Sequence, residues 1–308
     1  MYSLSKIKKV LCKISGCKII ENAPMSQYTS FKIGGPADLM VEPTNCEGLQ
    51  KILQFFSRAN VPYFVLGKGS NLLVGDRGIR GVVIKMTGLN YIRIEGNRIT
   101  AGAGVTLAKL ASCALESELT GLEFASGIPG TLGGAVVMNA GAYGGEMKDI
   151  ITQVIAYTPA GEKKVLTNEE IGFGYRKSIF QKNGWIVVEA EMKLKKGDPV
   201  EIRAKMIDLN NRRKEKQPLE YPSAGSVFKR PKGYYVGALI EEAGLKGYTI
   251  GDAQVSQKHA GFIINRGNAT AKDVLSLIRY IQKRVWEMEG VELEPEIRLV
   301  GEFNSDED

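Results

Sequence analysis

The sequence is poor in histidine and cysteine, the residues that most often build metal and disulfide sites. It holds one histidine, His259, and four cysteines, Cys12, Cys17, Cys46 and Cys113, in 308 residues. Their spacings match neither a zinc site nor a disulfide framework. We therefore expect reduced, structural cysteines and no metal centre.

Long apolar runs and the common nucleotide-binding motifs are also missing. No apolar run approaches the ~20 residues that span a bilayer, and residues 1–14 interleave lysines with apolar residues, unlike a signal peptide. This predicts a cytoplasmic protein with no membrane partner. The sequence has no GxxxxGK[ST] loop, and the stretch from Gly67 to Ser70 lacks the last glycine of GxGxxG. A P-loop ATPase or a nicotinamide-binding Rossmann domain is therefore poorly supported.

Positive charge is in excess, with a formal net charge of +7. Such a charge favours anionic partners, whether nucleic acid, a phosphorylated cofactor or an acidic substrate. The densest basic run, residues 212–216, holds no aromatic residues that would stack on bases, and we interpret it as a solvated helix end. Nucleic-acid binding is therefore not expected. The acidic residues 306–308 are expected to form a frayed tail.

A helix between two strands, at 39–41 and 63–66, predicts a β-α-β unit with parallel strands. The helix begins with a capping box of Thr44 and Glu47 and ends at Asn60. A glycine-rich stretch follows the second strand. Because open α/β sheets bind ligands at the carboxyl ends of parallel strands, this position favours a binding loop.

The rest of the chain also alternates strands and helices, which makes the fold class α/β or α+β with mixed sheets. Its length favours two domains, and the best boundary lies at residues 195–199, where Asp198 and Pro199 open a helix. The other predicted elements are a strand at 82–84, a hairpin at 91–101, a helix at 106–118, strands at 154–158 and 186–194, a helix at 270–290 and a strand at 296–300.

Glycine is concentrated in one region, with seven glycines in the nineteen residues from Gly127 to Gly145. Glycine allows positive φ and lets backbone N–H groups approach a pyrophosphate that a Cβ would block. The region therefore favours a large phosphorylated cofactor. The alternative is a set of tight turns between short strands.

Three further segments, each weak alone, carry polar residues: 175–178, 223–231 and 293–298. A lone surface arginine or glutamate is usually solvated, and Ser226 near turn residues is usually a turn hydroxyl. In this order with the two glycine-rich loops, however, they resemble the UDP-N-acetylenolpyruvoylglucosamine reductases, flavoproteins of bacterial peptidoglycan precursor synthesis. The similarity covers nearly the whole chain, residues 28–301.

The resemblance implies a two-lobed FAD-binding domain, of the type found in vanillyl-alcohol-oxidase-like flavoproteins, at residues 1–198, with lobes of about 1–80 and 81–198. An α+β substrate-binding domain follows at 199–308, and its last strand is expected to return to the FAD domain. FAD should bind without a covalent link, since neither loop holds a histidine or cysteine. The residues implied to hold FAD are Gly67, Lys68, Gly69, Ser70, Asn71, Leu72, Ser126, Gly127, Ile128, Pro129, Gly130, Thr131, Gly133, Gly134, Asn139, Ala140 and Gly141.

Family members use two stages: NADPH reduces FAD, and the flavin then passes hydride to the enolpyruvyl double bond of a UDP-sugar. By resemblance, Arg176 binds the substrate carboxylate bidentately and stabilises the negative charge that develops. Glu296 shares this task if it is protonated, and Ser226 donates the proton to the second carbon. The implied substrate-binding residues are Tyr175, Lys216, Lys229 and Arg230, the two lysines holding the diphosphate.

Two other functions remain open to the residues alone. A related FAD-dependent oxidase would react with oxygen, but the set of Arg176, Ser226 and Glu296 argues against it. A basic nucleic-acid-binding protein would need stacking aromatics or a recognition motif. We interpret His259 as a structural histidine at a strand start, where a neutral imidazole satisfies a backbone group, and we expect a monomer.

Overall fold

The computed structural model describes residues 3–303, which form two compact units. Unit 1 comprises the chain up to Glu21, Leu39–Lys68 and Gly81–Arg213, and unit 2 comprises Asn22–Asp38, Gly69–Arg80 and the chain from Lys214 onward. These units differ from the predicted boundary at residues 195–199, because the next helix stays with unit 1 up to Arg213. The division of the chain into an FAD domain at 1–198 and a substrate domain at 199–308 stays a prediction. The expected acidic tail lies outside the described residues.

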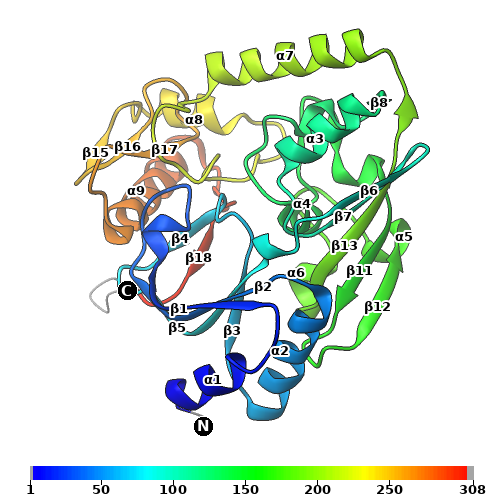
Figure 1. Cartoon of the computed structure of the whole chain (residues 1–308). Coiled ribbons are helices and arrows are strands. Elements are labelled where there is room, and N and C mark those ends of the chain that lie inside the picture. The colour runs from blue at the N-terminus through cyan, green and yellow to red at the C-terminus, as the bar shows by residue number, and fades with distance from the viewer. Residues whose placement is uncertain (1–2, 304–308) are drawn as a thin grey trace. The chain divides into compact units, whose positions relative to one another are not determined.

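The larger sheet of unit 1 is antiparallel, with the strand order β12-β11-β13-β7-β6 (Figure 1). β6 and β7 form the predicted hairpin. Glu95 pairs with Arg98 across a turn at Gly96, whose φ of 61° suits glycine. The strands are β6 (Ile92–Glu95), β7 (Arg98–Gly102), β11 (Ile151–Tyr157), β12 (Lys163–Thr167) and β13 (Ile186–Lys193).

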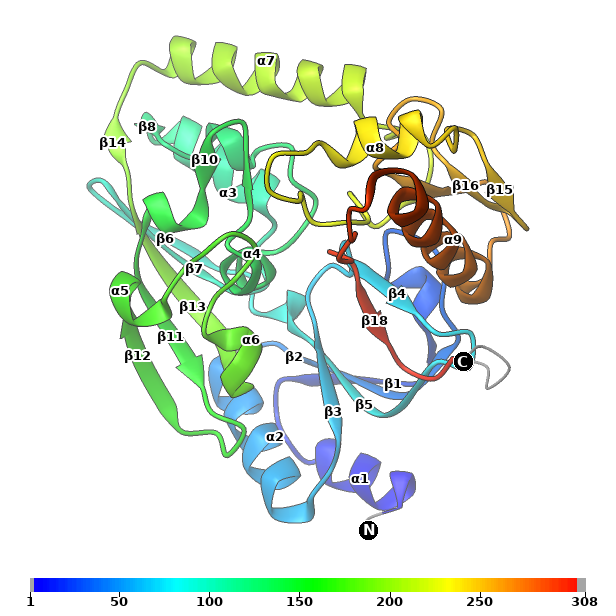
Figure 2. The same cartoon turned by 180° about the vertical axis from the view of Figure 1, so that it is seen from behind.

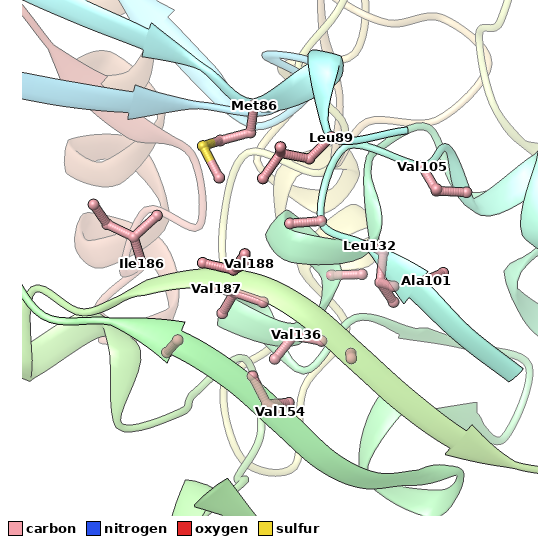
Figure 3. Packing of buried hydrophobic residues seen from close by; sticks show 14 of the residues in the cluster. Met86, Leu89, Ala101, Val105, Leu132, Val136, Val154, Ile186, Val187 and Val188 are labelled. Atoms are coloured by element: carbon pink, nitrogen blue, oxygen red, sulfur yellow. The ribbon is translucent and has the colours of Figure 1, made fainter. Parts of the chain in front are cut away.

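Helix α4 (Leu132–Met138) packs against this sheet (Figure 3). Leu132 and Val136 of α4 are fully buried in one cluster with Val154 of β11 and Val188 of β13. Burial of such a side chain contributes roughly 1.5–3 kcal/mol. The sheet therefore fixes α4, and with it the glycine-rich loop that precedes the helix.

The second sheet has the order β1-β2-β5-β3. The predicted succession of strand, helix and strand is present, but β5 lies between β2 and β3, and β3 pairs with β5 in parallel. These elements are β1 (Cys17–Pro24), β2 (Pro36–Pro43), α2 (Cys46–Ala59), β3 (Tyr63–Leu66) and β5 (Ile79–Lys85).

The start of α2 corrects the predicted capping box. Asn45 is the N-cap, and its side chain accepts a hydrogen bond of 2.8 Å from the N–H of Gly48. Thr44 instead donates its hydroxyl to the carbonyl of Gly16, at 3.0 Å. Asn60, in the left-handed conformation, ends the helix as predicted.

Unit 2 contains a small antiparallel sheet of order β15-β16-β17 (Figure 1) and a parallel pair, β4 and β18 (Figure 2). β18 therefore pairs with a segment from the first 80 residues. The long helix α9 starts after Thr270 and ends at Gly290, both as predicted. Thr270 and Asp273 form a capping box at its start. The elements are β4 (Leu72–Val74), α8 (Val236–Glu242), β15 (Thr249–Ile250), β16 (Ala253–Val255), β17 (Ile263–Asn265), α9 (Ala271–Glu289) and β18 (Arg298–Val300).

The other helices include α7, which begins at Pro199 with Asp198 accepting from the N–H of Val200 at 2.8 Å, as predicted. None of the helices in residues 3–303 has the length and apolar character that crossing a membrane requires. The remaining elements are α1 (Leu4–Leu11), α3 (Leu107–Glu116), α5 (Asn168–Ile171), α6 (Phe180–Asn183), α7 (Pro199–Lys216), β8 (Leu119–Thr120), β9 (Gly141–Ala142), β10 (Gly145–Glu146), β14 (Lys195–Lys196) and 3-10 turns at Met25–Gln27, Met86–Gly88, Glu123–Ala125 and Met147–Asp149.

Candidate active site

The two predicted cofactor loops meet in unit 1. Gly67 directly follows β3, and Thr131 is the N-cap of α4. A Cβ placed on Gly67 would lie 2.6 Å from Oγ1 of Thr131, so only glycine allows this approach. The structure thus brings together loops that lie more than 60 positions apart in sequence.

The start of α4 divides its glycines into two kinds. The N–H of Gly133 donates to the carbonyl of Ala103 at 2.9 Å, and a Cβ on Gly133 would lie 2.9 Å from Cβ of Ala103. Gly133 therefore serves close packing. Gly134 is exposed, and a Cβ there would meet only Oγ1 of Thr131, at 3.7 Å. The open space beside Gly134 and Thr131 fits a phosphate-bearing ligand that approaches the backbone.

The predicted loop at Ser126 and Gly127 packs against α7. Asn210 donates its amide to Oγ of Ser126 at 3.2 Å, and a Cβ on Gly127 would lie 2.5 Å from Oδ1 of Asn210 and 3.2 Å from Cδ of Arg213. Burial lowers the pKa of the Arg213 guanidinium. No ion pair or hydrogen bond holds that guanidinium within residues 3–303. A partly buried, unpaired cation beside the loop suits an anionic ligand.

Sequence reasoning missed Arg213, because the whole basic run was interpreted as solvated. That interpretation is right for the exposed Arg212, Lys214 and Lys216 but wrong for Arg213. The helical spacing could have identified Arg213. It lies four positions after the buried Leu209 and therefore on the same, buried face of α7.

The second part of the first glycine-rich loop belongs to unit 2. A Cβ on Gly69 would lie 2.1 Å from the carbonyl oxygen of Tyr28, so this glycine is required for packing. Asn71 donates its side-chain amide to the carbonyl of Glu296 at 3.0 Å. Leu72, predicted to contact FAD, begins β4 and has a buried side chain. Asn71 thus links the predicted cofactor loop to a predicted catalytic residue.

Ser226 and Glu296 lie on neighbouring segments of unit 2. The N–H of Glu296 donates to the carbonyl of Val227 at 2.7 Å, and the hydroxyl of Ser226 donates to the carbonyl of Phe228 at 3.2 Å. The structure therefore brings together two of the three predicted catalytic residues, which lie 70 positions apart in sequence.

Arg176, the third predicted catalytic residue, belongs to unit 1. Its backbone is in the left-handed region, with φ of 52°, and its guanidinium lies 5.3 Å from the centre of the Tyr175 ring. Tyr175 is 59% exposed. A left-handed backbone at a non-glycine residue needs support from its surroundings.

The other predicted substrate residues lie in unit 2 and carry positive charge. Lys229 pairs with Glu294. The guanidinium of Arg230 lies 3.9 Å from the centre of the Tyr235 ring, and its Nε donates to the carbonyl of Tyr234 at 3.1 Å. This cation–π contact orients the arginine.

His259 lies four residues before β17, ahead of the turn that leads into the strand, and not at the strand start predicted for it. Its Nδ1 accepts a hydrogen bond of 3.1 Å from the N–H of Gly261, which confirms the interpretation that a neutral imidazole satisfies a backbone group. The carbonyl of Gly261 in turn accepts from Val227, next to Ser226. Burial lowers the pKa of His259, and the positive charge of Lys246 adds to this effect.

A separate surface pocket of about 410 Å³ lies in unit 1, on residues that sequence reasoning did not select. Tyr91, Glu189 and Cys46 are among its lining residues, and Tyr91 donates its hydroxyl to Glu189 at 2.9 Å. The glycine-rich loops and the predicted catalytic residues do not line this pocket.

Two family models match the chain. An FAD binding domain matches residues 37–167, and the C-terminal domain of UDP-N-acetylenolpyruvoylglucosamine reductase matches residues 217–300. The first match spans Gly67 and the glycine-rich region before and after α4, and the second spans Ser226 and Glu296.

Curated relatives and a solved structure agree with these models. The UDP-N-acetylenolpyruvoylglucosamine reductase of Caldanaerobacter subterraneus subsp. tengcongensis is 55% identical over 299 residues, which are 97% of this chain and 98% of the relative. That of Syntrophomonas wolfei is 56% identical over 282 residues, 91% of this chain and 94% of the relative. The crystal structure of the Thermus caldophilus enzyme matches with a TM-score of 0.79 at 39% identity, covering 92% of this chain and 98% of that one.

The predicted fold class, an FAD-binding domain joined to an α+β C-terminal domain, is confirmed by these matches. The mixed helices and strands of both units agree with it. Sequence identity to these two relatives is above 50% and covers more than nine-tenths of this chain and of each relative. Sequence similarity therefore establishes the family without the structural match. The chain belongs to the UDP-N-acetylenolpyruvoylglucosamine reductase family.

Proposed function

We propose that this protein reduces the enolpyruvyl group of UDP-N-acetylglucosamine-enolpyruvate to give UDP-N-acetylmuramate, with NADPH as the reductant and FAD as the cofactor. The product is a precursor of bacterial peptidoglycan. Membership of the family supports the reaction. The single structural observation that carries the proposal is the pairing of the segments at Ser226 and Glu296 through the 2.7 Å hydrogen bond to Val227.

FAD is held, in this proposal, by the meeting loops at Gly67 and Thr131 and by the open backbone at Gly134. The exposed Gly134 supports an anionic group beside the start of α4. Arg213, which has no ion pair within residues 3–303, supports one beside Gly127. Gly69, Gly133 and Leu72 support the loops by packing instead. The chemistry that FAD supplies when bound is hydride transfer, from NADPH to the terminal carbon of the enolpyruvyl group.

The protein residues handle the charge and the proton. Hydride addition at the terminal carbon breaks the carbon–carbon double bond and leaves an electron pair on the carbon that bears the carboxylate. Arg176 binds this carboxylate and stabilises its enolate form with two parallel N–H donors. A protonated Glu296 donates a further hydrogen bond. The hydroxyl of Ser226 then leaves the carbonyl of Phe228, 3.2 Å away, and gives its proton to the second carbon.

Lys216 and Lys229 are proposed to bind the UDP diphosphate, and Arg230 and Tyr175 are proposed as further substrate-binding residues. Lys229 must exchange Glu294 for the diphosphate. That exchange is inexpensive because Glu294 is 70% exposed, and solvent-exposed ion pairs contribute only about 0–1 kcal/mol. The diphosphate offers a denser negative charge than one carboxylate.

We place the enzyme in the cytoplasm, where NADPH and nucleotide sugars are made, and propose that it acts as a monomer without a nucleic-acid partner. A single chromatography run with light scattering tests the oligomeric state.

The experiment that tests the function starts with the absorption spectrum of the purified protein. We expect the bands of bound flavin, and release of all colour on denaturation and filtration. Addition of NADPH without oxygen should bleach the flavin, and the enolpyruvyl UDP-sugar should then restore it. A protein without flavin, or one reoxidised by oxygen but not by this substrate, would contradict the proposal.

A further inference from the structure

Asn139 closes helix α4 with a buried side chain whose hydrogen bonds all go to the protein. It lies in the left-handed conformation, with φ of 43°, and is 1% exposed. Its Nδ2 donates to Oε2 of Glu146 at 2.6 Å and to the carbonyl of Gly174 at 3.0 Å, and its Oδ1 accepts from the N–H of Lys148 at 2.9 Å. Two acceptors and one donor around it match a carboxamide in one orientation only.

The carbonyl of Gly174 begins the turn that carries Arg176. Gly174 and Lys177 exchange two backbone hydrogen bonds, from N–H of Gly174 to the carbonyl of Lys177 at 3.0 Å and in reverse at 3.1 Å. Arg176 lies between them in the left-handed region. Such a backbone is unfavourable for a residue with a Cβ, so the turn needs contacts that hold it.

Further hydrogen bonds fasten this turn to the same end of α4. The hydroxyl of Ser178, which is 1% exposed, donates to the carbonyl of Val137 at 2.7 Å. Gln181, on the neighbouring helix α6, donates its amide to the carbonyl of Arg176 at 3.0 Å and to that of Val137 at 3.2 Å. The last turn of α4 and the Arg176 turn are therefore one hydrogen-bonded assembly.

Helix α4 thus connects two proposed functional parts of unit 1. It begins at Thr131, in the loop proposed for FAD, and ends at Asn139, which holds the Arg176 turn. The helix is rigid because its apolar face is buried against the sheet (Figure 3). Both donors of the Asn139 amide are already used, so its side chain has no N–H left for a cofactor.

We infer that Asn139 is a positioning residue for Arg176 and not an FAD contact. The inference rests on the proposed role of Arg176 and assigns Asn139 to the substrate half of the reaction. This replaces the expectation, from the family resemblance, that Asn139 holds the cofactor. Through Gly174, the asparagine sets where the guanidinium stands relative to the start of α4.

The test uses Asn139→Asp in the FAD-loaded enzyme at about pH 8. Aspartate keeps the size and tolerates the left-handed backbone, but as a carboxylate it lacks both N–H donors and repels Glu146. We expect FAD content and flavin reduction by NADPH to change less than ~3-fold, since neither involves the Arg176 turn. Reoxidation by the enolpyruvyl substrate should slow ~10- to 100-fold, the loss expected when a catalytic group is displaced by about 1 Å.

A double-mutant comparison separates positioning from general damage. In the Arg176→Ala background, Asn139→Asp should slow reoxidation by less than ~2-fold, because the group that it positions is gone. Losses that multiply in the double variant would overturn the inference. Loss of FAD from a folded Asn139→Asp protein would also overturn it and restore the cofactor role.

An exposed residue provides the second variant, should Asn139→Asp fail to fold. Gln181→Met removes the hydrogen bond to the carbonyl of Arg176 at the surface. We expect FAD to stay bound and reoxidation to slow by ~3- to 10-fold. An unchanged rate would contradict the claim that Gln181 helps to hold the Arg176 turn in place. Normal reoxidation in Arg176→Ala would refute the proposed role of Arg176 itself. A slow Arg176→Ala with normal Asn139→Asp and Gln181→Met would refute the inference alone.

Discussion

The hydroxyl of Ser226 is a weak acid, so its position decides whether it can donate a proton to the substrate. It lies beside the Glu296 segment, held by main-chain hydrogen bonds on both sides of Val227. Those bonds fix the backbone and leave the side chain free to rotate away from Phe228. Ser226 is therefore expected to act only in the half-reaction that reduces the substrate.

Ser226→Ala is expected to separate the two half-reactions. Flavin reduction by NADPH should stay nearly intact, because the hydroxyl takes no part in it. Reoxidation by the enolpyruvyl substrate should slow ~10²- to 10⁴-fold, the usual loss when a general acid is removed. Stopped-flow absorbance of the flavin measures both steps, and equal damage to both would contradict the assignment.

Glu296 offers a test of its protonation state. Gln retains the shape and an N–H donor, so Glu296→Gln should be less impaired than Glu296→Ala if the carboxyl works in its protonated form. Similar losses in both variants would mean that it works as a carboxylate. The rate of reoxidation decides, with FAD content as the control. Normal rates in both variants would remove Glu296 from the mechanism.

His259 predicts a pH dependence of stability. Burial lowers its pKa below the ordinary value of 6.5, so the folded protein favours the neutral ring that accepts from Gly261. The unfolded chain takes up a proton near pH 6.5 and the folded protein only at lower pH, so this contribution to stability is present above that value and is lost below it. The charged groups nearby are Lys246, paired with Glu241, and Lys258, paired with Glu220.

The measurement compares the Tm of the wild type and of His259→Asn between about pH 7.5 and about pH 5.5. Asparagine places an acceptor at the position of Nδ1 and does not ionise. The wild type should lose more Tm on acidification than the variant. An equal loss in both proteins would show that His259 does not titrate in this range.

The sequence predicted some residues of the site correctly and missed or misassigned others. The resemblance selected Ser226, Glu296 and Arg176, and the structure places the first two together. Asn139 was selected for its sequence neighbours, but its hydrogen-bond partners come from positions that no local pattern reveals. Arg213 was missed although its helical spacing placed it on the buried face.

At the scale of elements, α4 and its preceding loop carry the cofactor proposal. Local patterns predicted the hairpin of β6 and β7, the start of α7 and both ends of α9 correctly. The start of α2 was wrong by one residue, because Asn45 competes with Thr44 for the N-cap and asparagine is the better cap. The insertion of β5 between β2 and β3 depends on distant pairing that short windows do not contain.

Two adjacent glycines in α4 give a matched pair of variants. Gly134→Val should yield a folded protein with little FAD, because Gly134 is exposed and its side chain would occupy the proposed ligand space. Gly133→Ala should instead destabilise the fold by about 1–3 kcal/mol through overpacking against Ala103. Denaturation curves and flavin content distinguish the two. Wild-type flavin content in Gly134→Val would move the binding site elsewhere.

For the whole molecule, composition narrowed the possible binding partners without choosing between them. The charge of +7 allowed nucleic acid or a phosphorylated ligand, and the motifs in order chose between them. The make-up of the two units was beyond local reasoning. Segments 22–38 and 69–80 join the chain beyond residue 213, and such grouping depends on contacts between distant positions.

On this chain, hydride is proposed to travel from NADPH through FAD to an enolpyruvyl UDP-sugar. The most direct measurement mixes the enzyme, first reduced by NADPH without oxygen, with UDP-N-acetylglucosamine-enolpyruvate and follows the visible absorption band of oxidised flavin. We predict that the band returns in the wild type and returns slowly in Ser226→Ala, with UDP-N-acetylmuramate as the product. A band that returns only when oxygen is admitted, with the sugar unchanged, would contradict the account.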